Sequence, residues 1–156
     1  MKNHIELQDI IRPVQTIPVT ANLKETLSQM LKEHTNSLFV IDRDGKLVGI
    51  VTVLDILKEI TPDYLEDKNV IMSSFVTEDM FIEDVRKCEN TLVSTFMRSD
   101  TPIVDQQASV VEAILRAMSN ERSRVAVVDQ EGRPVGMLTR TEIKSVLGDY
   151  LDLPTA

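Results

Sequence analysis

The sequence predicts an α+β fold in which two β-α-β-β-α repeats pack sheet to sheet about a pseudo-twofold axis. The first supporting observation is an internal duplication: a shift of 87 positions carries residues 21–58 of this 156-residue chain onto residues 108–145 without a gap. The second is a continuous apolar run in each copy, and the third is a glycine turn after each run. The identical pairs include Ala21/Ala108, Glu25/Glu112, Val40/Val127, Asp42/Asp129, Gly45/Gly132, Val48/Val135, Gly49/Gly136 and Thr52/Thr139.

Each copy opens with a short strand and an amphipathic helix. We expect the strand at Ile17 in the first copy and at Ile103-Val104 in the second. Asn22 with Glu25, and Ser109 with Glu112, predict capping boxes, in which a side-chain oxygen accepts an early helical N–H. The apolar stripes of the two helices are Leu23, Leu27, Met30 and Leu31, and Val110, Ala113, Ile114, Ala117 and Met118.

A hairpin and a second helix complete each copy. The apolar runs 38–41 and 125–128 are typical of strands buried on both faces. Asp44-Gly45 and Glu131-Gly132 then predict tight turns, with glycine supplying a positive φ. The next strands, 47–51 and 135–138, lead into the second helices. A short amphipathic segment precedes each copy; its apolar residues are Leu7, Ile10 and Ile11, and Val93, Phe96 and Met97.

These boundaries give a first repeat with its N-terminal helix at 1–60, a helical connector at 61–92, a second repeat at 93–151 and a tail at 152–156. A unit of about 60 residues buries too little surface to be comfortably stable alone. Two units packed together solve this problem and leave two equivalent clefts between them. In the connector, Thr61-Pro62 predicts a short helix. Thr77 predicts the start of a longer helix with an apolar stripe of Phe81, Val85, Cys88, Leu92 and Phe96, on which Cys88 is a packing residue; whether Asn90 interrupts this stripe stays open.

The net charge of −8 is concentrated in the connector. Residues 1–60 and 93–151 each carry seven basic and eight acidic groups, whereas residues 61–92 carry three basic and eight acidic groups. Without a basic face, nucleic acid is not an expected partner. The longest apolar run, 47–54, is too short to cross a bilayer, and the first residues lack the apolar core of a secretory signal. Cys88, the single cysteine, fits a reducing compartment, so we expect a cytoplasmic protein.

The strand-to-helix corners carry the most informative motif. The first corner is Gly49-Ile50-Val51-Thr52-Val53-Leu54-Asp55, and the second is Gly136-Met137-Leu138-Thr139-Arg140-Thr141-Glu142. A duplicated β-α-β-β-α unit ending in glycine, hydrophobic, any, threonine, any, any, aspartate resembles the CBS domain in its tandem form, the Bateman module. The resemblance covers residues 7–60 and 93–151. It implies a regulatory, non-catalytic homodimer that binds AMP, ADP, ATP or S-adenosylmethionine in the clefts between repeats and requires no cofactor or metal.

The resemblance also implies roles for particular residues. Asp55 would accept hydrogen bonds from the ribose, and Thr52 would contact the ribose or α-phosphate beside the helix N–H groups. Gly49 would let the ligand or a facing backbone come close. Ile17 and Pro18 would flank the adenine, with Val104 at the equivalent place of the second copy. The residue before the central strand, often a basic phosphate ligand in the family, is Arg124 in the second copy but Ser37 in the first.

Two alternatives stay open for the corners. Thr52 with Asp55, and Thr139 with Glu142, are also capping boxes, and Glu142 departs from the family's aspartate. One hypothesis is a shared site, in which Asp55 holds the ribose and Arg124 reaches the phosphates. The other is a dimeric interaction scaffold whose degenerate clefts bind a protein and no nucleotide, with an effector protein that the sequence does not identify. Catalysis is disfavoured, because the sequence has no phosphate loop and no Gly-x-Ser-x-Gly motif.

Overall fold

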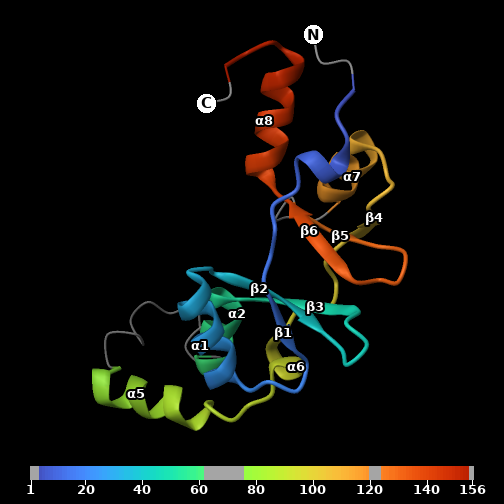
Figure 1. Cartoon of the computed structure of the whole chain (residues 1–156). Coiled ribbons are helices and arrows are strands. Elements are labelled where there is room, and N and C mark those ends of the chain that lie inside the picture. Colours follow the sequence, from blue (N-terminus) through green and yellow to red (C-terminus); the bar gives the residue numbers. More distant parts are fainter. Residues whose placement is uncertain (1–3, 62–75, 120–123, 155–156) are drawn as a thin grey trace. The chain divides into compact units, whose positions relative to one another are not determined.

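The structure is a computed structural model that describes residues 4–61, 76–119 and 124–154 (Figure 1). It confirms the α+β fold class and the two repeats. The first repeat contains β1 (Thr16–Pro18), α1 (Leu23–Glu33), β2 (Ser37–Ile41), β3 (Leu47–Thr52) and α2 (Val53–Ile60). The second contains β4 (Ile103–Asp105), α7 (Val110–Ala117), β5 (Val125–Val128), β6 (Pro134–Leu138) and α8 (Arg140–Tyr150). The remaining described elements are η1 (Leu7–Asp9), α5 (Glu78–Lys87) and α6 (Val93–Phe96).

Each repeat forms its own three-stranded sheet, with strand order β1-β2-β3 in one and β4-β5-β6 in the other. In the second sheet β4 is parallel to β5, and β5 is antiparallel to β6. The central strands are the most deeply buried, as their apolar runs predict. Gly45 and Gly132 both have φ of 82°, which confirms the predicted glycine turns. Asp42 and Asp129 stabilise these turns, because each Oδ1 accepts two backbone N–H groups.

The first helix of each repeat buries a narrower stripe than the sequence predicts. Leu23, Met30 and their counterparts Val110 and Ala117 are buried, but Leu31 and Met118 are 70% and 68% exposed, so that part of the prediction is wrong. The stripe follows positions i, i+3, i+4 and i+7, which places Thr26 inside and confirms Ala113 as a buried residue. Thr26 satisfies its hydroxyl by donating to the carbonyl of Asn22, at 2.8 Å.

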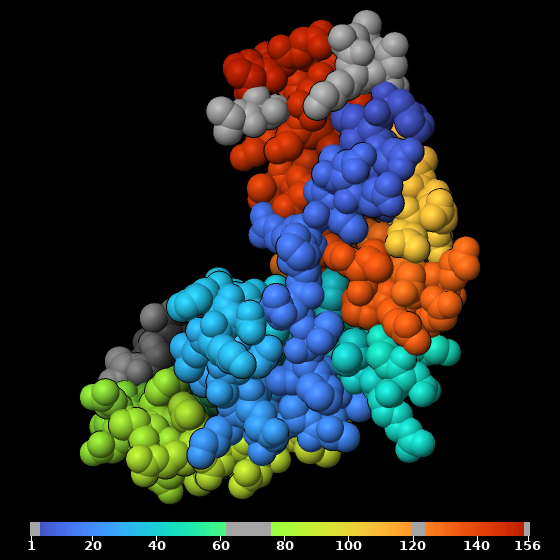
Figure 2. Space-filling view, in the orientation of Figure 1, coloured from blue at the N-terminus to red at the C-terminus, as the bar shows by residue number. Residues whose placement is uncertain are grey.

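The segments that precede the repeats pack in exchanged positions. The described residues form two compact units: one holds those of 1–14, 41–47 and 100–156, and the other those of 15–40 and 48–99. Leu7 therefore lies in the core of the second repeat, and Val93 and Phe96 lie in the core of the first. Figure 2 shows the N-terminal segment, in dark blue, against the orange and red residues of its unit. The sequence did not predict this exchange.

Backbone hydrogen bonds fix both exchanged segments. Arg12 and Met137 exchange two bonds of 2.8 Å, and Arg98 and Ile50 exchange two bonds of the same length. The segment around α6 is held further, since the N–H of Val93 donates to the carbonyl of Ala21. Each core is thus completed by a segment from elsewhere in the chain, which explains how repeats of this size reach a stable core.

The connector agrees with the sequence in part. Thr77 caps α5 by accepting the N–H of Met80, as predicted. The helix ends at Lys87, before Asn90, so the interrupted form of the predicted stripe is the one found, and Phe81 and Leu92 are 36% and 49% exposed. Cys88 is half-buried against the first core, which supports its packing role. Burial, with the charges of Glu59 and Asp84, raises the pKa of its thiol, so the unreactive protonated form is favoured. The predicted helix at Pro62 lies outside the described residues.

We predict that Leu7→Ala destabilises the whole protein, because Leu7 fills the second core from outside its repeat. Removing a buried leucine side chain typically costs about 2–5 kcal/mol of unfolding free energy. Chemical denaturation followed by circular dichroism measures the change. Leu31→Ala is the matched control, since an exposed side chain on a helix changes stability by only about 0.5 kcal/mol. Equal effects of the two substitutions would show that the exchanged segment does not support the core.

Candidate functional site

The first corner is a buried helix cap. Thr52 ends β3 and is the N-cap of α2. Its backbone N–H and its hydroxyl both donate to Asp55 Oδ2, at 2.9 Å, and the N–H of Asp55 donates back to Thr52 Oγ1 at 3.3 Å. Thr52 and Asp55 are 8% and 4% exposed. The predicted capping box is therefore present, and it holds the carboxylate of Asp55 in one orientation.

The second corner repeats this arrangement with a longer side chain. Thr139 is the N-cap of α8, and its N–H donates to Glu142 Oε2 at 2.8 Å. The hydroxyl of Thr139 donates to the same oxygen. The capping-box interpretation thus holds for both corners.

Each capping carboxylate also forms an ion pair with an arginine from an exchanged segment. Arg98 Nε lies 2.8 Å from Asp55 Oδ1, and Arg12 Nε lies 2.8 Å from Glu142 Oε1. Sequence reasoning missed both arginines. A shift of 86 positions superposes Ile11-Arg12 on Met97-Arg98, whereas the gap-free repeat has a shift of 87. Extending the repeat past this one-residue gap shows that Arg12 and Arg98 are equivalent residues, but not which carboxylates they contact.

The motif glycines make room for these arginine segments. A Cβ added to Gly49 would lie 2.8 Å from both the carbonyl oxygen of Arg98 and the sulfur of Met97. At Gly136 it would lie 2.8 Å from the Ile11 side chain and 2.9 Å from the Arg12 carbonyl oxygen. Such contacts are too short for any other residue. Of the two predicted roles for Gly49, close approach of a facing backbone is the one seen here.

The carboxylates have little acceptor capacity left. An ionised carboxylate offers about four acceptor positions. Among the described residues, the two Thr52 donors occupy Asp55 Oδ2, and Arg98 occupies one position of Oδ1. Glu142 is used in the same way by Thr139 and Arg12. A ribose diol that donates two hydrogen bonds to Asp55 would therefore need one position more than the present arrangement leaves.

The other predicted ligand contacts lie on or beside the strands. Ile17 and Val104 are the central residues of β1 and β4, and both side chains are buried in the hydrophobic cores. Pro18 ends β1 and is exposed. Ser37 begins β2, and Arg124 directly precedes β5; both are half-buried. In β1 the exposed residues, rather than Ile17, present side chains to the outside.

Comparison with protein families decides the identity of this fold. The model of the CBS domain matches residues 7–62 and 93–149. The chain belongs to the CBS domain family. The expectation drawn from the corners is thus confirmed, and the two repeats form a CBS pair.

Related proteins span nearly the full chain. A CBS domain-containing protein of Dictyostelium discoideum is 30% identical over 137 residues, which are 85% of this chain and 86% of that protein. The crystal structure of CBSX2, a CBS-pair protein of Arabidopsis thaliana, superposes with a TM-score of 0.72 at 19% identity, covering 97% of this chain and 100% of CBSX2. A structure of CBSX2 in complex with AMP has a TM-score of 0.63 at 20% identity, covering 93% and 98% of the two chains. At these identities the structures establish the fold.

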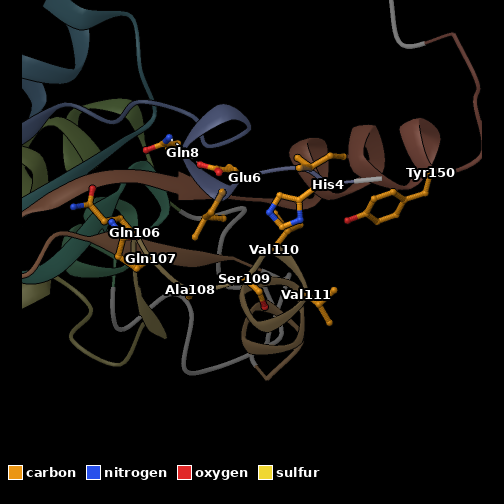
Figure 3. Close-up of a pocket in the computed structure, with 12 residues that line it drawn as sticks. His4, Glu6, Gln8, Gln106, Gln107, Ala108, Ser109, Val110, Val111 and Tyr150 are labelled. Carbon is orange, nitrogen blue, oxygen red and sulfur yellow. Dashed lines mark hydrogen bonds between the residues drawn. The ribbon is translucent and has the colours of Figure 1, made fainter. Parts of the chain in front are cut away.

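A separate pocket in the unit of the second repeat contains no residue of either corner in its lining (Figure 3). It has a volume of about 430 Å³ and surrounds the start of α7. In Figure 3, His4 and Tyr150 lie toward one end of it and Gln106 and Gln107 toward the other. None of the predicted ligand-binding residues lines it. In the described ranges no three potential metal ligands gather into a site, and no helix there is long and apolar enough to span a membrane.

The environment of Glu142 makes the second corner pH-sensitive. Burial alone would raise the pKa of Glu142, but the hydrogen bonds from Thr139 and the charge of Arg12 outweigh burial and lower the pKa. A lowered folded-state pKa means that the ionised carboxylate contributes stability above its unfolded pKa of about 4.3. This contribution is lost as the pH falls through the folded-state value.

We therefore predict that Glu142→Gln reduces the acid dependence of stability. The wild-type melting temperature should fall below about pH 4.3 partly because Glu142 becomes protonated. In the variant this part is absent, so the melting-temperature difference between the two proteins should be largest at neutral pH and shrink on acidification. Thermal unfolding from pH 7 to pH 3 measures it. Glu131→Gln, on an exposed turn, is the control, and a pH-independent difference at Glu142 would contradict the prediction.

Proposed function

We propose that this CBS pair is a regulatory, non-catalytic module that senses an adenine nucleotide, AMP, ADP, ATP or S-adenosylmethionine, at its first corner. Membership of the family and the AMP complex of CBSX2 support this class of ligand. The ligand would bind one arrangement of the module more tightly than the others and so increase the population of that arrangement. This shift would change the surface that the module presents to an effector protein. The proposal places the protein in the cytoplasm.

The position of Asp55 is the observation that carries the proposal. Its carboxylate is buried, accepts hydrogen bonds from the N–H and hydroxyl of Thr52 and from the Arg98 guanidinium, and is held at the N-terminus of α2. Ribose hydroxyls are donors that such a carboxylate recognises, and the adjacent helix terminus favours phosphate. A rigid acceptor beside an anion-favouring helix start is the chemistry that a nucleoside phosphate requires.

The residues of the corners are engaged in caps and ion pairs, which supports a binding role rather than catalysis. Their hydroxyls donate to carboxylates that are themselves paired with arginines. The carboxylate beside each threonine is a weak general base, because it also caps a helix and is paired with an arginine. The shared-site hypothesis, with Arg124 on the phosphates, remains part of the proposal.

We predict that adenine nucleotides raise the melting temperature of the wild-type protein and that Asp55→Asn weakens their binding. Hydrogen bonds to charged groups contribute about 1.5–3 kcal/mol, so the dissociation constant should rise by about tenfold or more. Asparagine is preferable to alanine because it keeps the size of the side chain at a buried cap. AMP, ATP, NADH and S-adenosylmethionine are screened by thermal shift, and hits are titrated by calorimetry.

Two further variants sharpen this test. Arg124→Ala should weaken phosphate-bearing ligands if the shared site is correct. Glu83→Gln removes an exposed charge from α5 and should leave every constant unchanged, since Glu83 and its partner Lys87 are 70% and 67% exposed. No thermal shift with any ligand of the panel would favour the alternative function, a dimeric scaffold that binds a protein and no nucleotide. The observation that favours this alternative is that the carboxylates of Asp55 and Glu142 already accept hydrogen bonds from a threonine and an arginine.

The proposal includes a homodimer that forms through the helices of the second repeat. Large apolar side chains are exposed on α7 and α8 and just beyond α8: Val111 57%, Leu115 61%, Met118 68%, Leu147 52%, Leu151 71% and Leu153 55%. Several of them line an apolar groove of about 860 Å³ between these helices. Contiguous exposed patches of this kind mark interaction surfaces, and a second copy presents the same patch about a twofold axis.

We predict that Leu147→Glu makes the protein monomeric. A dimer would have to bury the introduced carboxylate without a partner, which is costly. Light scattering coupled to size-exclusion chromatography gives the mass of each variant. Leu31→Glu, at a 70% exposed position on α1, serves as the control and should leave the dimer intact. A monomeric wild-type protein, or a dimer that tolerates Leu147→Glu, would refute this interface.

A further inference from the structure

We propose that Arg98 is a ligand-binding residue of the first corner that changes partner on binding: it pairs with Asp55 in the empty site and with the ligand phosphate in the occupied one. This inference rests on the proposed function and deepens it. It assigns a role to a residue outside the glycine-threonine-aspartate motif. It also gives the site its specificity, because a full ligand must supply both a vicinal diol and an anion.

The first step of the argument is competition for Asp55. Oδ2 accepts two hydrogen bonds from Thr52, which form the second half of the capping box of α2. Oδ1 accepts from Arg98 Nε at 2.8 Å. A diol that donates both hydroxyl groups to Asp55 must therefore take the position of Arg98, because displacing Thr52 instead would break the capping box of α2.

The second step concerns the displaced guanidinium. Asp55 is 4% exposed and is the acidic partner that the structure gives Arg98, so an arginine that leaves it loses a charge-assisted bond. Compensation requires another anion close by. The phosphate of a nucleoside phosphate is such an anion, and arginine binds it through the same forked donors that bind a carboxylate. A neutral nucleoside offers no such replacement.

The third step is that Arg98 can move while its backbone stays fixed. The backbone is anchored by two hydrogen bonds to Ile50 and is packed on Gly49. Its side chain is 32% exposed, so the guanidinium borders solvent and can change rotamer without opening the core. The anchored backbone keeps the moving guanidinium within reach of the corner. Arg98 thus has a backbone fixed by hydrogen bonds and a guanidinium that can move.

The experiment compares adenosine with AMP on wild-type protein and Arg98→Gln by calorimetric titration. In the wild type, AMP should bind at least about tenfold more tightly than adenosine, because the phosphate replaces the lost ion pair. In Arg98→Gln the two ligands should change in opposite directions. Adenosine binds several-fold more tightly, since Asp55 no longer has a charged competitor, and AMP binds several-fold more weakly, since its phosphate loses a partner.

Opposite signs distinguish this role from a structural one. If Arg98 only supported the fold, Arg98→Gln would weaken both ligands together, and that result overturns the inference while leaving the proposed function intact. Unchanged constants for both ligands overturn it in the same way. If wild-type protein binds neither ligand, the proposed function and this inference fail together. Lys87→Gln removes an exposed cation from α5 and controls for net charge; neither ligand should respond to it.

A second variant keeps the test valid if Arg98→Gln does not fold, which its melting curve reveals. Arg98→Lys retains the positive charge but replaces the planar fork with a point charge. The ion pair with Asp55 should weaken, so adenosine should gain affinity by about a few-fold, while AMP should lose part of its advantage. An adenosine affinity equal to that of the wild type, or below it, in a folded Arg98→Lys protein overturns the inference.

Discussion

The structure depends on one constraint: the segment that precedes each repeat packs against the motif strand of the other repeat. Each such contact lies within one compact unit. Two backbone hydrogen bonds join Arg98 to Ile50, and a further two join Arg12 to Met137. Gly49 and Gly136 permit this approach, since a Cβ at either position would collide with the facing segment. The same segments deliver Leu7 and Val93 to cores that lack them in their own repeat. The motif glycine, the exchanged segment and the core therefore stabilise one another, and neither repeat contains all three.

The corner motif performs structural and recognition tasks with the same atoms. Thr52 and Asp55 satisfy the first N–H groups of α2, as any capping box does. What separates this cap from an ordinary one is the ion pair with Arg98 at a carboxylate that is 4% exposed. Ion pairing at such depth is a weak source of stability, because desolvation offsets much of the Coulomb attraction. Separating the pair is costly, however, because it leaves a buried charge without a partner. A ligand can therefore rearrange this pair only if it supplies a new partner to both Asp55 and Arg98.

Local sequence signals predicted most of the fold, and long-range ones were missed. The strands, the glycine turns and the capping boxes follow from residues a few positions apart, so the pattern of Asp44-Gly45 or Asn22 with Glu25 was enough. Leu31 and Met118 were misassigned because they follow Leu23 and Val110 by eight residues, which places them about 80° round the helix, at the edge of the apolar face. The exchange of segments could not be inferred, because no residue near Leu7 in the sequence indicates which of the two apolar cores it joins. Arg98 and Arg12, the partners of Asp55 and Glu142, lie on the exchanged segments, so these ion pairs could not be predicted either.

The chain connectivity gives the proposed change at Arg98 a route to the second repeat. Arg98 belongs by contact to the unit that contains α2, yet it precedes β4, the first strand of the other sheet, by only a few residues. A ligand that releases Arg98 from Asp55 alters the side-chain contact of a segment whose backbone leads directly into β4. Such a release transmits a signal only if the two states of the segment differ in how they bind the ligand, because a ligand with equal affinity for both shifts nothing. Loss of the ion pair in one state and gain of a phosphate contact in the other supply that difference.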